Sequence, residues 1–208
     1  DKVLISSSEE NMEKENKLVM KAAINDRKVY ALIRANPESY KKEEFLKFLE
    51  RTFRSSDKIV GLKINPSTEK RRVTDSVYRR ALEILNDEEL VLLLHCGRWV
   101  EMSGWRYGTE IAKQYPKIKV ILAHMGGTHP ELAIPAIEAS KPLINVLMDT
   151  SQTRQIVVLE RGIEKLGTEK ILFGSDMPWG DYLQNLVGIL SLELSESCLL
   201  YTSDAADE

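Results

Sequence analysis

The sequence predicts an α/β fold built on a parallel sheet, and three observations support this prediction. Short runs rich in Val, Ile and Leu recur along the chain, amphipathic stretches separate them, and the spacing between runs is nearly constant. Unbroken apolar runs of this kind are typical of strands buried on both faces. A strict alternation of strands and helices implies right-handed crossovers between parallel neighbours.

Seven strands are predicted, all short and nearly free of polar residues. They occupy residues 3–7, 29–35, 59–65, 90–95, 120–124, 144–149 and 171–174. The ends of six successive runs are marked by Asn36, Asn65, His95, His124, Thr150 and Asp176, at separations of 29, 30, 29, 26 and 26 residues. Each separation has the length of one strand–helix unit.

Helices are predicted between the strands, where apolar residues recur at helical spacing and indicate one face packed on the sheet. The three clearest stripes are Phe45, Leu49 and Phe53; Val77, Ala81 and Leu85; and Ile156, Leu159, Ile163 and Leu166.

Two architectures fit this alternation, and a barrel is favoured. A closed (β/α)₈ barrel takes ~250 residues, so about 28 residues per unit leave room for seven units here. A doubly wound open sheet would gather its polar residues at one switch point, often after a G-x-G-x-x-G motif. No such motif follows a first strand, and polar residues end many of the predicted strands. We therefore expect an incomplete (β/α)₈ barrel.

Composition narrows the classes of function. Of the 208 residues, 43% are apolar and 29% charged, with a net charge of −3. No apolar run approaches the ~20 residues of a membrane span, and no basic stripe indicates nucleic acid. We expect neither partner. Two distant cysteines, Cys96 and Cys198, favour a reducing compartment, and we expect a cytoplasmic location.

The last segment differs from everything before it. Residues 198–208 resemble the conceptual translation of a sequencing adapter rather than a native tail. We therefore assign residues 1–197 to the barrel and set residues 198–208 aside.

The candidate site lies at the carboxyl ends of the predicted strands. His95 and His124 end two consecutive strands, and Asp176 follows the last one. In a barrel these ends meet at one mouth, where active sites are found. Imidazole nitrogen and carboxylate oxygen can hold a divalent cation that lowers the pKa of bound water toward ~7. The pattern indicates a metal or acid–base site.

Five segments together resemble the amidohydrolase superfamily, in its amidohydrolase-related branch of metal-dependent hydrolases and non-oxidative decarboxylases. In chain order they are VGLKINP (60–66), LLHCG (93–97), VILAHMGG (120–127), NVLMDTS (145–151) and ILFGSDMP (171–178).

The resemblance implies a role for each of the three candidate residues. His95 would bind a single divalent metal, zinc or alternatively manganese. Asp176 would touch the metal and take a proton from its bound water. His124 would stabilise the developing negative charge of a small-molecule substrate or move a proton. Lys63 is expected to have a structural role or to bind a substrate carboxylate.

One departure from the family pattern concerns its first strand, which carries an H-x-H pair of metal ligands. No H-x-H occurs in this sequence, so we number the strands two to eight and place the first unit upstream of Asp1. At most two of the four expected ligands remain. We expect this fragment to bind metal weakly and to be inactive, although its full-length parent would be an enzyme.

Three functions stay open. The first is hydrolysis of a small organic substrate by metal-activated water. The second is decarboxylation of an aromatic or unsaturated acid at the same site. The third is an inactive barrel that serves as a binding module. The sequence also leaves open whether the chain forms a homo-oligomer.

Overall fold

A computed structural model describes residues 2–8, 11–97 and 99–192. They form one parallel sheet whose seven strands follow chain order from β1 to β7. The strands are β1 (Val3–Ser6), β2 (Val29–Ile33), β3 (Ile59–Ile64), β4 (Val91–Leu94), β5 (Lys119–Leu122), β6 (Val146–Asp149) and β7 (Ile171–Leu172). The prediction of an α/β fold with seven parallel strands is confirmed. The assignment of residues 198–208 lies outside the described residues.

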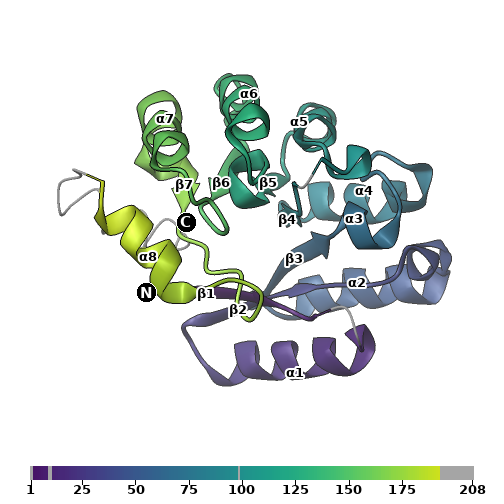
Figure 1. The fold of residues 1–208 in the computed structure, drawn as a ribbon. Helices are drawn as coiled ribbons and strands as arrows, with labels where there is room; N and C mark the ends of the chain where they lie inside the picture. Colours follow the sequence, from purple (N-terminus) through teal and green to yellow (C-terminus); the bar gives the residue numbers. More distant parts are fainter. Residues whose placement is uncertain (1, 9–10, 98, 193–208) are drawn as a thin grey trace.

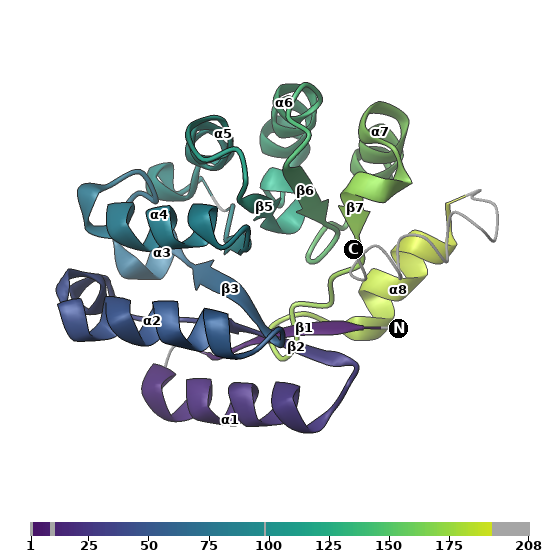
Figure 2. The same ribbon diagram turned by 180° about the vertical axis from the view of Figure 1, so that it is seen from behind.

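The sheet curls into part of a barrel, with helices on its outer side (Figures 1 and 2). The helices are α1 (Met12–Asn25), α2 (Glu43–Ser55), α3 (Pro66–Glu69), α4 (Arg79–Asp87), α5 (Trp105–Gln114), α6 (Pro130–Ser140), α7 (Ile156–Leu166) and α8 (Tyr182–Leu190). Among the described strands β1 and β7 occupy the two ends of the order and do not pair. This open, curled sheet agrees with an incomplete (β/α)₈ barrel.

The apolar runs are buried as their pattern predicts. Leu62 and Ile64 of β3 and Leu92 and Leu94 of β4 are almost completely buried in the core. Lys63, between the two buried residues of β3, is only half-buried. Because successive side chains of a strand point to opposite faces, Lys63 points into the inside of the curl.

The helical stripes are confirmed with one exception. Leu49, Ala81 and Leu85 are fully buried between helix and sheet. Ile156 is 38% exposed, because it begins α7 and the inward face of that helix is formed by Val158, Leu159 and Leu166. None of the described helices has the length and apolar character to cross a membrane.

Most of the predicted strands end one or two residues earlier than the sequence pattern indicates, and two of these early ends bear on the candidate site. The run 171–174 pairs only over Ile171 and Leu172, and the Gly174 N–H donates to the Thr150 hydroxyl at 3.2 Å instead. The run 120–124 ends at Leu122, and His124 lies in a following 3₁₀ turn (Ala123–Gly126). Both departures occur at the carboxyl edge of the sheet, where the chain turns toward the candidate site.

Candidate active site

Polar side chains gather at the carboxyl edge of the sheet. His95 directly follows β4, His124 lies two residues after β5, and Asp149 ends β6. Asp176 follows β7. Since these strands are parallel neighbours, their ends meet at one mouth. The predicted site residues therefore lie on the same edge of the molecule.

The two predicted histidines are in direct contact. His124 Nε2 lies 3.1 Å from His95 Nδ1, and the ring centroids are 4.9 Å apart at an interplanar angle of 78°. His124 is only 2% exposed, whereas His95 is half-buried. A hydrogen bond thus joins the ends of β4 and β5, with one imidazole donating and the other accepting.

The backbone at His124 has an uncommon conformation. His124 and Met125 have φ angles of 58° and 55°, and Gly126 follows with φ 80°. A Cβ on Gly126 would lie 2.4 Å from the Ala136 Cβ in α6, so glycine is needed for packing as well as for the left-handed φ. Non-glycine residues in this region cost about 1–3 kcal/mol and cluster at functional sites.

Asp149 and Ser151 hold His124 through a network of hydrogen bonds. Asp149 Oδ1 accepts from the backbone N–H of His124 and of Ser151, each at 3.0 Å, and also from the Ser151 hydroxyl. His124 Nδ1 lies 2.8 Å from Ser151 Oγ and 3.1 Å from the Ser151 carbonyl oxygen. Both nitrogens of the His124 ring therefore have partners.

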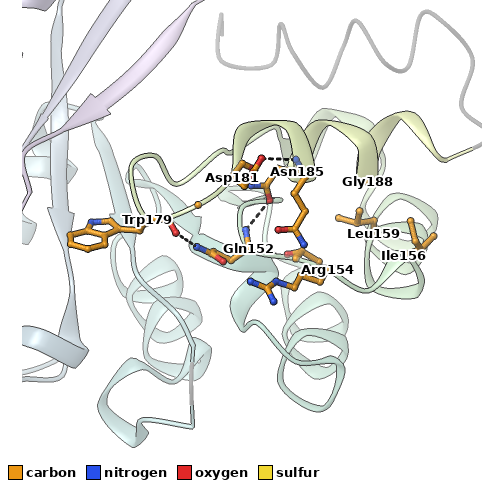
Figure 3. Close-up of a pocket in the computed structure, with 11 residues that line it drawn as sticks. Gln152, Arg154, Ile156, Leu159, Trp179, Asp181, Asn185 and Gly188 are labelled. Carbon is orange, nitrogen blue, oxygen red and sulfur yellow. Dashed lines mark hydrogen bonds between the residues drawn. The ribbon is translucent and has the colours of Figure 1, made fainter.

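Asp176 is held differently. Its Oδ2 accepts from Gln152 Nε2 at 3.2 Å, and the same amide group donates to the Trp179 carbonyl oxygen at 3.2 Å. The Gln152 backbone N–H donates in turn to Asn185 Oδ1 at 3.0 Å. Figure 3 shows the contacts of Gln152 with Trp179 and Asn185. These residues line a cavity of about 170 Å³ between the β6–α7 loop and α8. Asp176 and Gln152 also have positive φ angles, 54° and 58°.

Two basic residues lie at the carboxyl ends of β2 and β3. Arg34 directly follows β2 and is 4% exposed, and its backbone is held by buried Asn16, which binds both its N–H and its carbonyl oxygen. The register of β2 and β3 pairs Ile33 with Leu62, and Arg34 and Lys63 are the next residues of the two neighbouring segments. Burial lowers the pKa of Lys63, and the nearby positive charge of Arg34 lowers it further. The carboxylates of Asp149 and Asp176 act in the opposite direction.

A second cavity, of about 420 Å³, lies between the loop after β4 and the starts of α5 and α6. Gly97 and Gly126 are on its wall. Trp99 and Trp105 supply aromatic surface there, and the Arg106 guanidinium lies 4.8 Å from the Trp105 ring centroid. Neither His95 nor His124 is among the residues that line this cavity.

Cys96 and His129 lie apart from the histidine pair. Cys96 is fully buried, its Sγ lies 3.6 Å from the Leu94 carbonyl oxygen, and burial raises the pKa of the thiol far above its usual value. His129 is exposed and caps α6, where its Nδ1 accepts from the Glu131 N–H at 3.4 Å.

The described residues do not form a complete metal site. His95 and Asp176 offer the donor atoms that zinc and manganese accept. A catalytic zinc site uses three protein ligands. Within residues 2–8, 11–97 and 99–192, no group of three or more His, Cys, Asp or Glu side chains could hold a metal ion.

Sequence reasoning missed Ser151, Gln152 and Arg34. Ser151 belongs to the NVLMDTS segment, two residues after Asp149, so its place at a strand end was a usable signal. Gln152 and Arg34 had no such signal, because an isolated Gln or Arg beside a strand is ordinary. Their roles come from contacts with Asp176 and Asn16, which are distant in the sequence.

Comparisons with known proteins bear on the family and the fold. A family model described as amidohydrolase matches residues 10–197. No curated protein matches the chain.

Three solved structures illustrate the similarity. A 5-carboxyvanillate decarboxylase from Sphingomonas paucimobilis is 18% identical, with a TM-score of 0.71 over 94% of this chain and 70% of that one. A 5-carboxyvanillate decarboxylase from Novosphingobium aromaticivorans, complexed with manganese and a nitrobenzoic acid, is 12% identical, with a TM-score of 0.72 over 100% and 75%. An amidohydrolase from Burkholderia multivorans with bound zinc is 13% identical, with a TM-score of 0.69 over 91% and 75%. At these identities the similarity establishes the fold.

Proposed function

We propose, since this chain belongs to the amidohydrolase family, that it carries the catalytic mouth of a metal-dependent hydrolase acting on a small organic substrate. The observation that carries the proposal is the contact between His95 and His124, whose rings approach to 3.1 Å at the ends of neighbouring strands. Asp176 lies on the same edge of the sheet.

The three residues have distinct proposed roles. His95 and Asp176 would contact one divalent ion, zinc or manganese, which when bound supplies Lewis acidity and lowers the pKa of water toward ~7. Asp176, a carboxylate held by a single amide, can accept a proton from water. His124 would stabilise the developing negative charge of the substrate or help to move a proton.

The ligand set leads to a proposal about metal affinity. Because the described residues bring together fewer than three donors, we expect this chain to bind zinc weakly and to lack useful activity. We propose that it is part of a longer enzyme in which its strands are strands two to eight. Isothermal titration of the chain with zinc tests the first point, and tight one-to-one binding would contradict it.

Decarboxylation of an aromatic or unsaturated acid is the second candidate function. Arg34 and Lys63 favour it, because two neighbouring cations inside the mouth suit a substrate carboxylate. The decarboxylases among similar structures add support. An assay of the full-length parent for carbon dioxide release, and for ester, lactone or amide cleavage, decides between decarboxylation and hydrolysis. If neither product forms in the presence of zinc or manganese, the third alternative, an inactive binding module, is favoured.

The remaining expectations are proposals of the same kind. We propose a cytoplasmic enzyme with no nucleic-acid or membrane partner, a barrel domain over residues 1–197, and a non-native segment at residues 198–208. Sedimentation of the chain tests whether it forms a homo-oligomer.

A further inference from the structure

In the hydrogen bonds that link Asp149, Ser151 and His124 Nδ1, the donor and the acceptor can be assigned by counting hydrogen atoms. Asp149 Oδ1 is a carboxylate oxygen and can only accept, so the Ser151 hydroxyl hydrogen points at it. A hydroxyl has one hydrogen. Ser151 Oγ must therefore accept, rather than donate, in its 2.8 Å contact with His124 Nδ1.

The Ser151 carbonyl oxygen is a second, independent acceptor near His124 Nδ1. It lies 3.1 Å from His124 Nδ1 and, as a carbonyl, can only accept. Both neighbours of Nδ1 are acceptors, so Nδ1 carries the hydrogen. In a neutral ring Nε2 then has a lone pair.

The tautomer of His124 also determines that of His95. With a lone pair on His124 Nε2, the 3.1 Å contact requires His95 Nδ1 to donate. The hydrogen of His95 is thus on Nδ1, and its Nε2 is the nitrogen with the lone pair. Metal-binding histidines commonly donate their other ring N–H to a fixed acceptor, which sets the tautomer and the ring orientation.

We propose that Asp149 and Ser151 are positioning residues that hold His124, and through it His95, in the Nδ1–H tautomer. Burial makes this assignment firm, because His124 and Ser151 are 2% and 3% exposed and water cannot readily replace the partners. The functional consequence rests on the proposed function: with its hydrogen on Nδ1, His95 would offer the lone pair of Nε2 to a divalent metal. The tautomers themselves do not depend on that function.

His129 provides an internal reference for the test. Its Nδ1 accepts from the Glu131 N–H, so its hydrogen is on Nε2, the tautomer that free histidine prefers. The three histidines of the chain are therefore predicted to divide into two Nδ1–H rings and one Nε2–H ring.

The experiment is a long-range ¹H–¹⁵N correlation spectrum of the metal-free chain labelled with ¹⁵N-histidine, at about pH 8, where unperturbed imidazole is neutral. We expect the Nδ1–H pattern for His95 and His124 and the Nε2–H pattern for His129, with His129→Gln assigning the reference. If His124 shows the Nε2–H pattern in the wild-type chain, the proposal is overturned.

Two serine variants sharpen the test. Ser151→Ala removes one acceptor, and we expect the Nε2–H tautomer to gain population at His124 and at His95 together. Ser140→Ala is the matched control, because Ser140 is fully buried and its hydroxyl has no hydrogen-bond partner among the described residues. It should leave all three rings unchanged. Identical spectra for Ser151→Ala and wild type would contradict the role of the Ser151 hydroxyl and leave the tautomer to the Ser151 carbonyl oxygen.

The spectrum also separates this inference from the proposed function. It needs neither metal nor turnover, so an inactive chain with two Nδ1–H rings would leave the inference intact. An active parent enzyme whose His124 is an Nε2–H ring would refute the inference alone.

Discussion

His124 and Asp176 lie at the same mouth and both have positive φ angles, yet their surroundings differ. His124 is 2% exposed, and both ring nitrogens are hydrogen-bonded. Asp176 is half-buried, and one side-chain amide, that of Gln152, holds it. The β5–β6 corner, formed by His124, Ser151 and Asp149, is therefore built before any ligand arrives, whereas the carboxylate after β7 can still adjust.

This difference has a physical origin. Three hydrogen-bond donors converge on Asp149 Oδ1, and buried donors are costly to leave without partners. Asp176 has solvent as an alternative partner, so a change there costs less. We therefore expect a substitution at Asp149 to lower the free energy of unfolding, and a substitution at Asp176 to affect the chemistry of the site with little effect on stability.

The largest effect is expected for Asp149→Ala. It removes the acceptor of two backbone N–H groups and one hydroxyl at a partly buried position. At ~1–3 kcal/mol for each donor left without a partner, the free energy of unfolding should fall by about 3 kcal/mol or more. Urea denaturation followed by circular dichroism measures it. A loss below about 1 kcal/mol would show that the β5–β6 corner is not held by this carboxylate.

Gly126→Ala should have the next largest effect. The new methyl group would meet Ala136 at 2.4 Å, and the backbone has φ 80°. Overpacking of this kind costs about 1–3 kcal/mol, measured by the same denaturation.

Gly188→Ala is the control for that substitution. Gly188 is inside α8, and a Cβ there meets only Leu159 Cδ1, at an ordinary 3.8 Å. Alanine in a helix interior is preferred to glycine by about 1 kcal/mol, so this variant should be neutral or more stable. Equal losses in the two variants would argue against the special packing at Gly126.

Lys63→Met should stabilise the chain at neutral pH, and the gain should depend on pH. Burial lowers the pKa of Lys63 in the folded state, against the attraction of Asp149 and Asp176. The unfolded chain therefore binds more protons at this residue, so wild-type stability rises as pH increases from the folded pKa to ~10.4. Denaturation at neutral and alkaline pH should show the advantage of Lys63→Met shrinking.

Exposed Lys113 in α5 provides the comparison for this experiment. Lys113→Met should change stability little at either pH. An advantage of Lys63→Met that grows with pH would reverse the sign argued here.

The smallest effect on stability is expected for Asp176→Asn. The amide keeps an oxygen that can accept from Gln152, and the group is half-buried. The free energy of unfolding should change by less than about 1 kcal/mol, while the carboxylate needed to accept a proton is lost. A large destabilisation would place Asp176 with His124 among the structural supports of the mouth.

Much of the architecture follows from the sequence alone. The alternation of apolar runs and amphipathic stretches is enough to predict a parallel α/β sheet, because strands that are buried on both faces consist almost entirely of apolar residues. The same regular spacing predicts that His95, His124 and Asp176 end on one edge, since parallel strands share the direction of their carboxyl ends.

Only the tertiary structure decided what each of these residues touches. The early end of β5 at Leu122, the contact of His124 with Ser151 and the amide of Gln152 on Asp176 depend on loops whose partners are 24 to 27 residues away in the chain. A polar side chain at the end of a strand has the same local sequence whether its neighbourhood is held by a carboxylate, as at His124, or by one side-chain amide, as at Asp176. Its partners are selected by three-dimensional packing, which local sequence patterns do not record.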